Sequence, residues 1–278
     1  LDAHLSARAD GIGQLTLTNR AAGLYSTGQL PLMNVRLAFR KSDEALIVDT
    51  FFAQLGVAQQ PAGKLEGNAR YSNGALTLKI GIDALNLHRL DQRLQSTLLA
   101  GTVDVQHAAG KQHMTIDLRE PVGKQKAALT ARATLADLRL VLQKAELRVG
   151  SGSIGATGYI DLLGIQSFHA EGNMHHFRLH DIAKFAQLPA LDLNGKFTLH
   201  GARQPRLTGD LSFQMEDSTL AGRLLQGQGQ VQLRTDRIVV PKLFLMAGDN
   251  RLDVHGELSP ADGRLFFTLS APQLAPLC

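Results

Sequence analysis

The chain of 278 residues contains no tryptophan, only 5% aromatic residues and a single cysteine, Cys278. A lone cysteine cannot form an internal disulfide, so cysteine usage says nothing about the redox compartment. No apolar run is long enough to cross a bilayer, and no signal segment with a charged start and an apolar middle is present. The hydrophobic content of 44% is therefore mainly aliphatic, and it excludes wholesale disorder.

The chain also lacks a large excess of one charge, because it contains 29 basic and 25 acidic residues. The basic residues are not clustered with aromatic ones, so we expect no nucleic-acid partner. Residues 150–155 (GSGSIG) lack the Lys-Ser/Thr of a phosphate loop, and we interpret them as a β-turn. Carboxylates such as Asp104, Asp117 and Asp253 alternate with apolar residues and form no acid–base pair. We predict no catalytic residue, no cofactor and no enzymatic activity.

The histidines at 175, 176 and 180 are the one group that could suggest a metal site. On a helix, His176 and His180 would place two imidazoles on the same face. Phe177 stands where a zinc-protease motif carries glutamate, and no third ligand is evident in the sequence. We interpret this stretch as a solvated approach to a helix and predict no metal site.

Alternation of apolar and polar residues is the commonest pattern, and it predicts half-buried β-strands with one apolar face. The alternating segments are residues 35–39, 76–80, 114–118, 197–199, 211–215, 231–233, 252–254 and 265–269. Glycine-containing pairs lie between them and predict tight turns: Asn73-Gly74, Gly209-Asp210, Gly248-Asp249 and Asp262-Gly263. We therefore expect serial antiparallel strands joined by short turns.

One module recurs 98 positions further along the chain, as from Gly150 to Gly248. The matched sets are Leu140, Leu142, Leu147, Gly150, Ile154 and Gly158, and Ile238, Val240, Leu245, Gly248, Leu252 and Gly256. Both copies predict a strand, a turn at the glycine and a second strand. Self-similarity of this kind is typical of repeat architectures, in which no single unit buries its apolar face alone.

Two segments carry leucines or other apolar residues at helical spacing instead, and they predict short amphipathic helices. These residues are Leu87, Leu90, Leu94 and Leu98 in the first segment, and Ile182, Phe185 and Leu188 in the second. Each segment precedes a new pair of strands. We therefore expect one elongated domain over residues 1–278 with the approximate units 1–100, 101–195 and 196–278. The pattern is incomplete at both ends, so we expect the chain to be part of a longer protein.

The predicted fold is all-β with short helices, an elongated curled repeat sheet whose apolar face lines a concave groove. An apolar face needs a cover, which could be a second sheet, a barrel closure, a partner or a ligand. The scarcity of large aromatics favours an open trough, and a packed two-sheet core is the alternative. Burial of an acyl chain would contribute about 0.8 kcal/mol per CH₂. The residues expected to line the groove are Phe197, Leu199, Leu211, Phe213, Met215, Val231, Leu233, Leu252, Val254, Leu265, Phe267 and Leu269.

Several runs in a fixed order carry a family resemblance: residues 209–211, 220–222, 227–231, 245–252, 263–265 and 274–277, with Gly256 between them. Residues 85–87, 98–101, 177–179 and 188–195 fit the same pattern. Together these runs resemble the C-terminal half of the TamB family, the inner-membrane subunit of the translocation and assembly module, within the AsmA-like group. The resemblance covers most of the chain and is densest after residue 130.

The resemblance implies a β-taco fold in the periplasm of a diderm bacterium, with an inner-membrane anchor outside this chain. It implies a role in outer-membrane biogenesis, protein secretion and phospholipid transport, with a TamA-type outer-membrane barrel as partner. The leading hypothesis is a bridge-like module whose groove shields phospholipid acyl chains, or nascent β-strands, between the two membranes. The alternative is a β-solenoid adhesin, passenger or scaffold with a packed core that binds partners through its surface.

Overall fold

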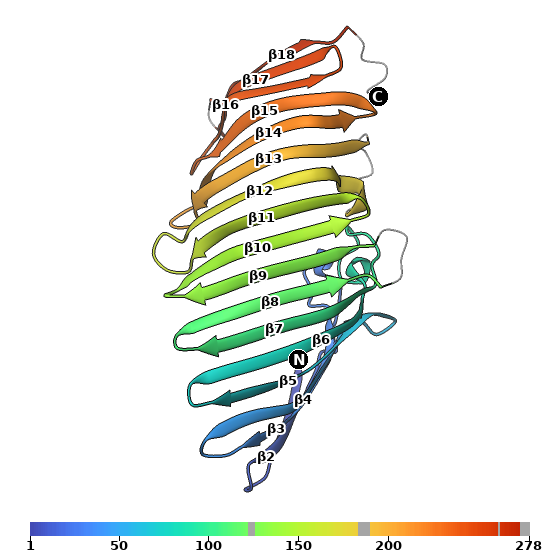
Figure 1. The fold of residues 1–278 in the computed structure, drawn as a ribbon, viewed down its shortest axis with the longest axis vertical. Coiled ribbons are helices and arrows are strands. Elements are labelled where there is room, and N and C mark those ends of the chain that lie inside the picture. The colour runs from blue at the N-terminus through green and yellow to red at the C-terminus, as the bar shows by residue number, and fades with distance from the viewer. Residues whose placement is uncertain (122–125, 183–189, 261, 273–278) are drawn as a thin grey trace. The chain divides into compact units, whose positions relative to one another are not determined.

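A computed structural model describes residues 1–121, 126–182, 190–260 and 262–272 of the chain. It divides into two compact units. Unit 1 comprises Leu1–Asp137 and Asp181–Lys184, and unit 2 comprises Leu138–His180 and Phe185–Cys278. Each unit contains nine of the described strands, and within a unit each strand pairs antiparallel with the next one in the sequence (Figure 1).

Unit 1 is a meander in which the ladder runs without interruption from β1 to β9. Its strands are β1 (Asp2–Ala7), β2 (Ile12–Thr18), β3 (Leu32–Lys41), β4 (Ala45–Val57), β5 (Gln60–Ser72), β6 (Ala75–Leu85), β7 (Leu99–Ala108), β8 (Lys111–Arg119) and β9 (Ala128–Ala136). Two short 3-10 turns, η1 (Tyr25–Thr27) and η2 (Leu87–Arg89), lie in the connections after β2 and β6.

Unit 2 repeats this arrangement from β10 to β18. Its strands are β10 (Arg139–Val149), β11 (Gly152–Asp161), β12 (Ser167–Arg178), β13 (Leu191–Ala202), β14 (Thr208–Leu220), β15 (Arg223–Leu233), β16 (Ile238–Ala247), β17 (Asn250–Leu258) and β18 (Leu265–Ser270). A third 3-10 turn, η3 (Leu179–Asp181), follows β12. All eight segments that the sequence predicts to be strands are strands, so the predicted all-β class and serial antiparallel order are confirmed.

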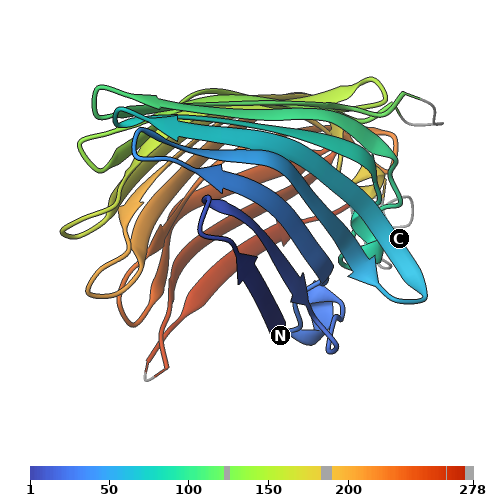
Figure 2. The ribbon, with the colours of Figure 1, turned by 90° about the horizontal axis from the view of Figure 1, so that it is seen from below.

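The strands are curved along their length, as those of unit 1 in blue to green show clearly (Figure 2). In unit 2, a change of register occurs at the same level of β12, β13 and β14, near His176, Asn194 and Asp217. The Asn194 side chain joins these three strands, because its Oδ1 accepts from the His176 N–H (2.8 Å) and its Nδ2 donates to the Asp217 carbonyl (2.9 Å). Such bulges bend a strand and increase its twist. We name these three residues the bulge column.

The repeat seen in the sequence is a repeated hairpin in the structure. Gly150 lies in the β10–β11 turn with φ +60°, and Gly248 lies in the β16–β17 turn with φ +58°. The β10–β11 ladder shifts register between Leu142 and Ala145, and the β16–β17 ladder shifts between Val240 and Leu243. These positions are again 98 residues apart, so turn, register and bulge all recur together. The predicted β-turn is confirmed at Gly150 and Ser151, whereas residues 152–155 belong to β11.

The matched turns allow a paired stability test. A side chain at φ near +60° costs about 1 kcal/mol relative to glycine, so Gly150→Ala and Gly248→Ala should each lower the free energy of unfolding by about that amount. Ala221 has φ +50° in the β14–β15 turn, and Ala221→Gly should raise stability by a similar amount. Urea unfolding measures all three. If Ala221→Gly changed the free energy of unfolding in the same direction as Gly150→Ala and Gly248→Ala, the role assigned to the backbone angle φ would be contradicted.

The prediction of a helix over Leu87–Leu98 is wrong, because only Leu87–Arg89 forms a single 3-10 turn. Side chains bond to the backbone here and replace the helical ladder. The Asn86 side chain accepts from the Arg89 N–H, and the Asp91 side chain accepts from the Arg93 N–H at 3.0 Å. The rest of the segment is an irregular crossover with a turn at residues 92–93, and it returns the chain to the sheet.

The second predicted helix, with Ile182, Phe185 and Leu188, falls largely outside the described residues. Ile182 itself lies in a turn. Residues 274–277, one of the runs that carry the family resemblance, also lie outside them. The turn predicted at Gly209-Asp210 is wrong, since both residues lie in β14. The true turn spans residues 203–207, and Gly209 instead lies near the ring of Phe168 from β12.

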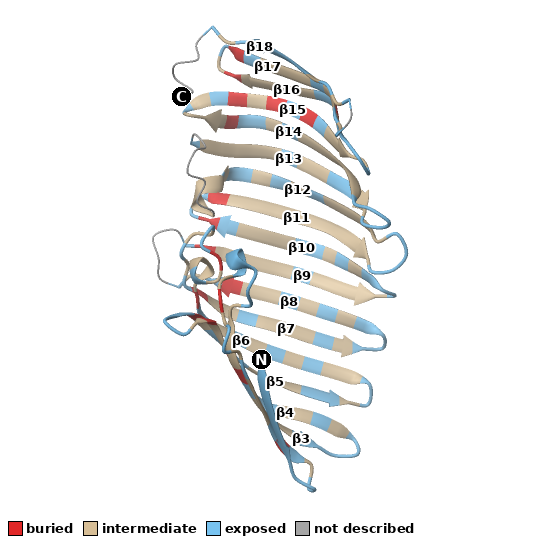
Figure 3. Ribbon diagram, turned by 180° about the vertical axis from the view of Figure 1, so that it is seen from behind, coloured by how far each residue is buried: buried red, intermediate tan, exposed pale blue. Residues whose placement is uncertain are grey.

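Little of the chain is fully buried. The accessible surface is 17218 Å² for a mass of 30.0 kDa. A compact monomer of this mass would expose about 11,700 Å². Buried residues concentrate at one end of the strands of unit 1 and in β15 of unit 2 (Figure 3). Among the described residues, no helix has the length and apolarity needed to span a membrane.

Candidate functional site

One face of unit 2 is apolar from its first strand to its last. Residues that pair directly across a β-ladder lie on the same face of the sheet, so the register identifies the side chains that share a face. The first row is Ala145, Ala156, Gly172, Phe197, Phe213, Gly229, Leu243, Val254 and Phe267. The second is Leu147, Ile154, Met174, Gly195, Met215, Gly227, Leu245, Leu252 and Leu269. Neither row contains a polar side chain.

Two further rows on the same face are equally apolar. One contains Leu142, Gly158, Ala170, Leu199, Leu211 and Val231, and reaches Val240, Gly256 and Leu265 beyond a bulge between β15 and β16. The other contains Leu140, Ile160, Phe168, Gly201, Gly209, Leu233, Ile238 and Leu258. We call the surface formed by these four rows the apolar face of unit 2.

All twelve residues that the sequence analysis assigned to a groove belong to this face. Most of them are half-buried, whereas Phe267 on the last strand is 73% exposed and Leu269 is 54% exposed. The sequence analysis missed the contributions of β10, β11, β12 and β16 to the same surface. Bulges in β10, β12 and β16 interrupt the alternation of apolar and polar residues. This alternation is the signal that could have identified the apolar side of these strands, and it is weaker there.

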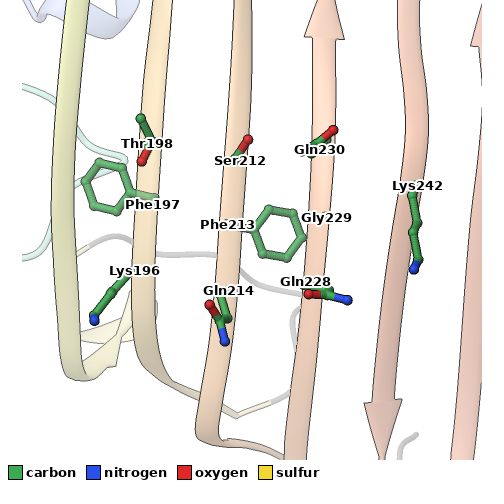
Figure 4. A pocket seen from close by; sticks show the side chains of 10 residues that line it. All are labelled: Lys196, Phe197, Thr198, Ser212, Phe213, Gln214, Gln228, Gly229, Gln230 and Lys242. Atoms are coloured by element: carbon green, nitrogen blue, oxygen red, sulfur yellow. The ribbon is translucent and has the colours of Figure 1, made fainter.

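Phenylalanine rings lie flat against this face because glycines stand beside them. A Cβ added to Gly229 would lie 2.7 Å from the Phe213 ring, and one added to Gly172 would lie 2.5 Å from the Phe197 ring. Figure 4 shows the Phe213 ring beside Gly229 of the neighbouring strand. A ring that covers a glycine shields the exposed backbone and adds little height to the surface. The apolar face of unit 2 is therefore smooth as well as continuous.

Unit 1 carries an apolar face of the same kind, with three uninterrupted rows. The first is Leu5, Leu15, Leu37, Phe51, Gly67, Ile80, Val103, Ile116 and Ala131. The second is Ala7, Gly13, Phe39, Val48, Ala69, Leu78, Val105, Met114 and Ala133. The third is Ala3, Leu17, Val35, Ala53, Leu65, Ile82, Gly101, Leu118 and Leu129.

The third row of unit 1 is partly buried, and the crossovers explain this. Val35, Ala53 and Leu118 are all buried, whereas Gly13 is the one buried member among the described residues of the other two rows. The row lies near the strand ends where the crossover after β6 begins, with the Asn86 N–H donating to the Ala62 carbonyl at 2.6 Å. Crossover segments thus cover one margin of the apolar face of unit 1 and leave the remaining rows accessible.

The crossovers are also joined to one another by main-chain hydrogen bonds. The Tyr25 N–H donates to the Leu90 carbonyl, and the Gln95 N–H donates to the Ile182 carbonyl, both at 2.9 Å. Each of the three segments precedes a new group of strands. They form a continuous margin along unit 1, which fixes the edge of its apolar face.

The opposite face of each sheet is polar, and several of its carboxylates are paired with basic side chains. Asp253 accepts two hydrogen bonds from Arg251, which hold the pKa of that carboxyl below its usual value. Hydrogen bonds from Lys144 and Arg148 lower the pKa of Glu146 in the same way. Pairing of this kind is typical of a solvated surface and leaves these carboxylates ionised at neutral pH.

Shallow hollows lie between long side chains of this polar face. One of about 390 Å³ extends over β13 to β16 of unit 2. Its polar lining consists of Lys196, Thr198, Ser212, Gln214, Gln228, Gln230 and Lys242 (Figure 4). This lining combines two hydroxyls, three amides and two ammonium groups, and it contains no carboxylate and no histidine.

The histidines at 175, 176 and 180 do not converge. His175 and His176 lie in β12, whereas His180 lies in η3, so the i, i+4 spacing does not fall on a helix. The His176 Nδ1 lies 3.3 Å from a carboxylate oxygen of Asp192 on the neighbouring strand. Within the described part of the chain, no group of three or more His, Cys, Asp or Glu residues is placed to hold a metal ion.

Comparisons with known proteins identify no relative. No family model, curated protein or solved structure matches the chain. The arguments for function therefore rest on the geometry of the two faces.

Proposed function

We propose that the apolar faces of units 1 and 2 bind the acyl chains of lipids and shield them from water. The observation that supports this proposal is the continuity of the rows, in which nine successive strands contribute no polar side chain. Monomeric proteins rarely leave so large an apolar surface without an occupant. In this proposal the protein is a binding and transport module rather than an enzyme.

Acyl chains fit such a face better than nascent β-strands do. The backbone N–H and C=O groups within the sheet are already paired in the ladders, and the rows offer no side chain that could donate or accept. An extended peptide laid across the rows would therefore bury polar backbone groups without partners, at a cost of a few kcal/mol each. A hydrocarbon chain has no polar groups to satisfy.

The dimensions of one unit also suit this occupant. Strands in a sheet are about 4.8 Å apart, so a row across nine strands is about 38 Å long. The lipid tails of one leaflet fill roughly half of a hydrocarbon core about 30 Å thick, so one tail is about 15 Å long. A row is thus longer than a lipid tail, and each buried CH₂ would contribute about 0.8 kcal/mol.

The resemblance to the TamB family suggests the setting for this role. In that setting the chain would lie in the periplasm as part of an inner-membrane-anchored protein with a TamA-type barrel as partner. The lipid would be phospholipid moving between the inner and outer membranes, in support of outer-membrane protein assembly. The alternative form, a β-solenoid, has parallel coils, whereas the strand pairings within each unit are antiparallel. A surface-binding scaffold is kept as an outcome of the test below.

Native mass spectrometry of the purified chain, combined with lipid extraction, tests the proposal. We expect protein peaks that carry phospholipid masses, and extracted lipid in stoichiometric amount. Detergent-stripped protein should regain these masses after incubation with phospholipid. A lipid-free chain that cannot be loaded would contradict lipid binding and favour the scaffold role.

A further inference from the structure

We propose that one loop edge of unit 2 docks onto an anionic lipid surface. Two neighbouring connections form this edge, residues 162–166 between β11 and β12 and residues 203–207 between β13 and β14. This docking surface is separate from the apolar face and does not depend on its occupancy. We call the two connections together the loop edge.

The loop edge exposes large aliphatic side chains. Leu163 is 65% exposed, Ile165 is 61% exposed and Leu207 is 52% exposed, and Leu162 is exposed beside them. They lie at loop tips rather than in the rows, so none of them contributes to the apolar face. Exposed aliphatic side chains at neighbouring loop tips are unfavourable in water and can insert between lipid headgroups.

Main-chain hydrogen bonds hold the two loops together as one surface. The Arg203 N–H donates to the carbonyls of Ile165 (3.1 Å) and Gln166 (3.2 Å), and the Gln204 N–H donates to the Ile165 carbonyl at 3.0 Å. A side-chain replacement leaves these bonds intact, because all of them are between backbone atoms. The loop tips can therefore be altered without separating the loops.

The charge of the loop edge gives the chemistry of the partner. Arg203 and Arg206 are exposed and form no ion pair with any described residue. Asp161, which precedes the first loop, is neutralised by Arg139, and Asp210, which follows the second, is neutralised by Arg234. The free charge of the loop edge is thus positive. Aliphatic tips flanked by unpaired arginines complement the headgroup region of an anionic membrane.

Three two-residue turns at the other edge of unit 2 differ in both respects. The turns after β10, β14 and β16 consist of two residues each, Gly150-Ser151, Ala221-Gly222 and Gly248-Asp249. They contain no large apolar side chain and no basic residue. Exposed aliphatics and free arginines thus coincide in the loop edge and are both missing from these turns.

Vesicle co-sedimentation tests the proposal with the complete chain. We expect the wild type to bind phosphatidylcholine vesicles that contain phosphatidylglycerol and to bind much less to phosphatidylcholine alone. The Leu163→Ser, Ile165→Ser double variant should bind the anionic vesicles roughly tenfold or more weakly. The Arg203→Gln, Arg206→Gln variant should also bind roughly tenfold or more weakly and should lose the preference for anionic lipid. Leu30→Ser, at a loop residue of unit 1 that is 52% exposed, is the matched control and should bind like wild type.

The outcomes separate this proposal from lipid binding on the apolar face. The loop-edge variants should keep the phospholipid masses in native mass spectrometry, and an apolar-face variant, Phe213→Asp, should keep vesicle binding. If the wild type did not co-sediment with anionic vesicles, the membrane assignment would be overturned, and the loop edge would instead be assigned to a protein partner. Equal losses with Leu30→Ser would overturn it as well, since binding would then come from general surface apolarity.

Discussion

Phe213→Asp is expected to remove bound phospholipid, with affinity falling about 100-fold. Phe213 lies in the middle of the first row of unit 2, between Phe197 and Gly229 on the two adjacent strands. A carboxylate at this point would have to lose its hydration beneath an acyl chain, at a cost of about 2.5–3.5 kcal/mol. Titration of detergent-stripped protein with phospholipid, followed by native mass spectrometry, measures the change.

Ser212→Asp is the matched control for this variant. Ser212 is the preceding residue of β14, and it points to the polar face, where it pairs with Thr198 and Gln230. The same charge placed there should leave lipid affinity unchanged. Phe213→Leu, which keeps an apolar side chain in the row, should retain most of the affinity. Circular dichroism and size-exclusion chromatography show that each variant is folded.

Val254→Asp repeats the test on β17, with Asp253→Asn as its polar-face partner. Val254 lies in the same row as Phe213, two strands beyond Gly229. Both apolar-face variants should therefore lose lipid together, while Asp253→Asn keeps it. Similar losses from changes on both faces would mean that lipid binding is not governed by the apolar rows.

Ser218→Ala should lower the free energy of unfolding by about 3 kcal/mol. Ser218 on β14 is fully buried. Its hydroxyl oxygen accepts from the Asn194 N–H (2.8 Å), and its O–H donates to the Asn194 carbonyl (2.9 Å). Alanine would leave both backbone groups buried without partners, and each such group costs about 1–3 kcal/mol. Because Asn194 joins the bulge column, the loss should also loosen β12 and β13 locally.

Urea unfolding and hydrogen exchange measure this effect. Ser212→Ala on the polar face of the same strand is the control and should change stability by no more than about 0.5 kcal/mol. Faster exchange of amides around His176 and Asp217 is expected only in Ser218→Ala. A loss of less than about 1 kcal/mol would show that the ladders alone hold the bulges.

Local patterns in the sequence were sufficient for the strands and for some of the turns. Side chains alternate between the two faces of a strand, so the alternation around Leu78 and Leu211 identified both the strands and their apolar side. The turns at Asn73-Gly74 and Gly248-Asp249 were equally visible, since these residues tolerate positive φ. The recurrence over 98 residues correctly indicated a repeated hairpin.

The predicted helix over Leu87–Leu98 failed for a reason that lies in side-chain chemistry. Its leucines have helical spacing, but Asn86, Asp91 and Thr97 hydrogen-bond to nearby backbone groups. Those bonds satisfy the backbone without a helix, and the pattern of apolar residues contains no information about them. The same limit applied to Gly209-Asp210, where the glycine lies within β14 close to the His200 carbonyl of the neighbouring strand rather than in a turn.

The sequence by itself determined the all-β class, the order of the strands, the parity of each strand and the repeated hairpin. Only the tertiary structure decided that twelve residues from five strands belong to one face, together with Leu147, Ile154 and Leu243 from others. Face identity between strands depends on register, and each bulge changes the register by one residue. Bulges held by residues distant in sequence, such as Asn194 and Ser218, are invisible to local patterns, because their partners meet only when the sheet forms.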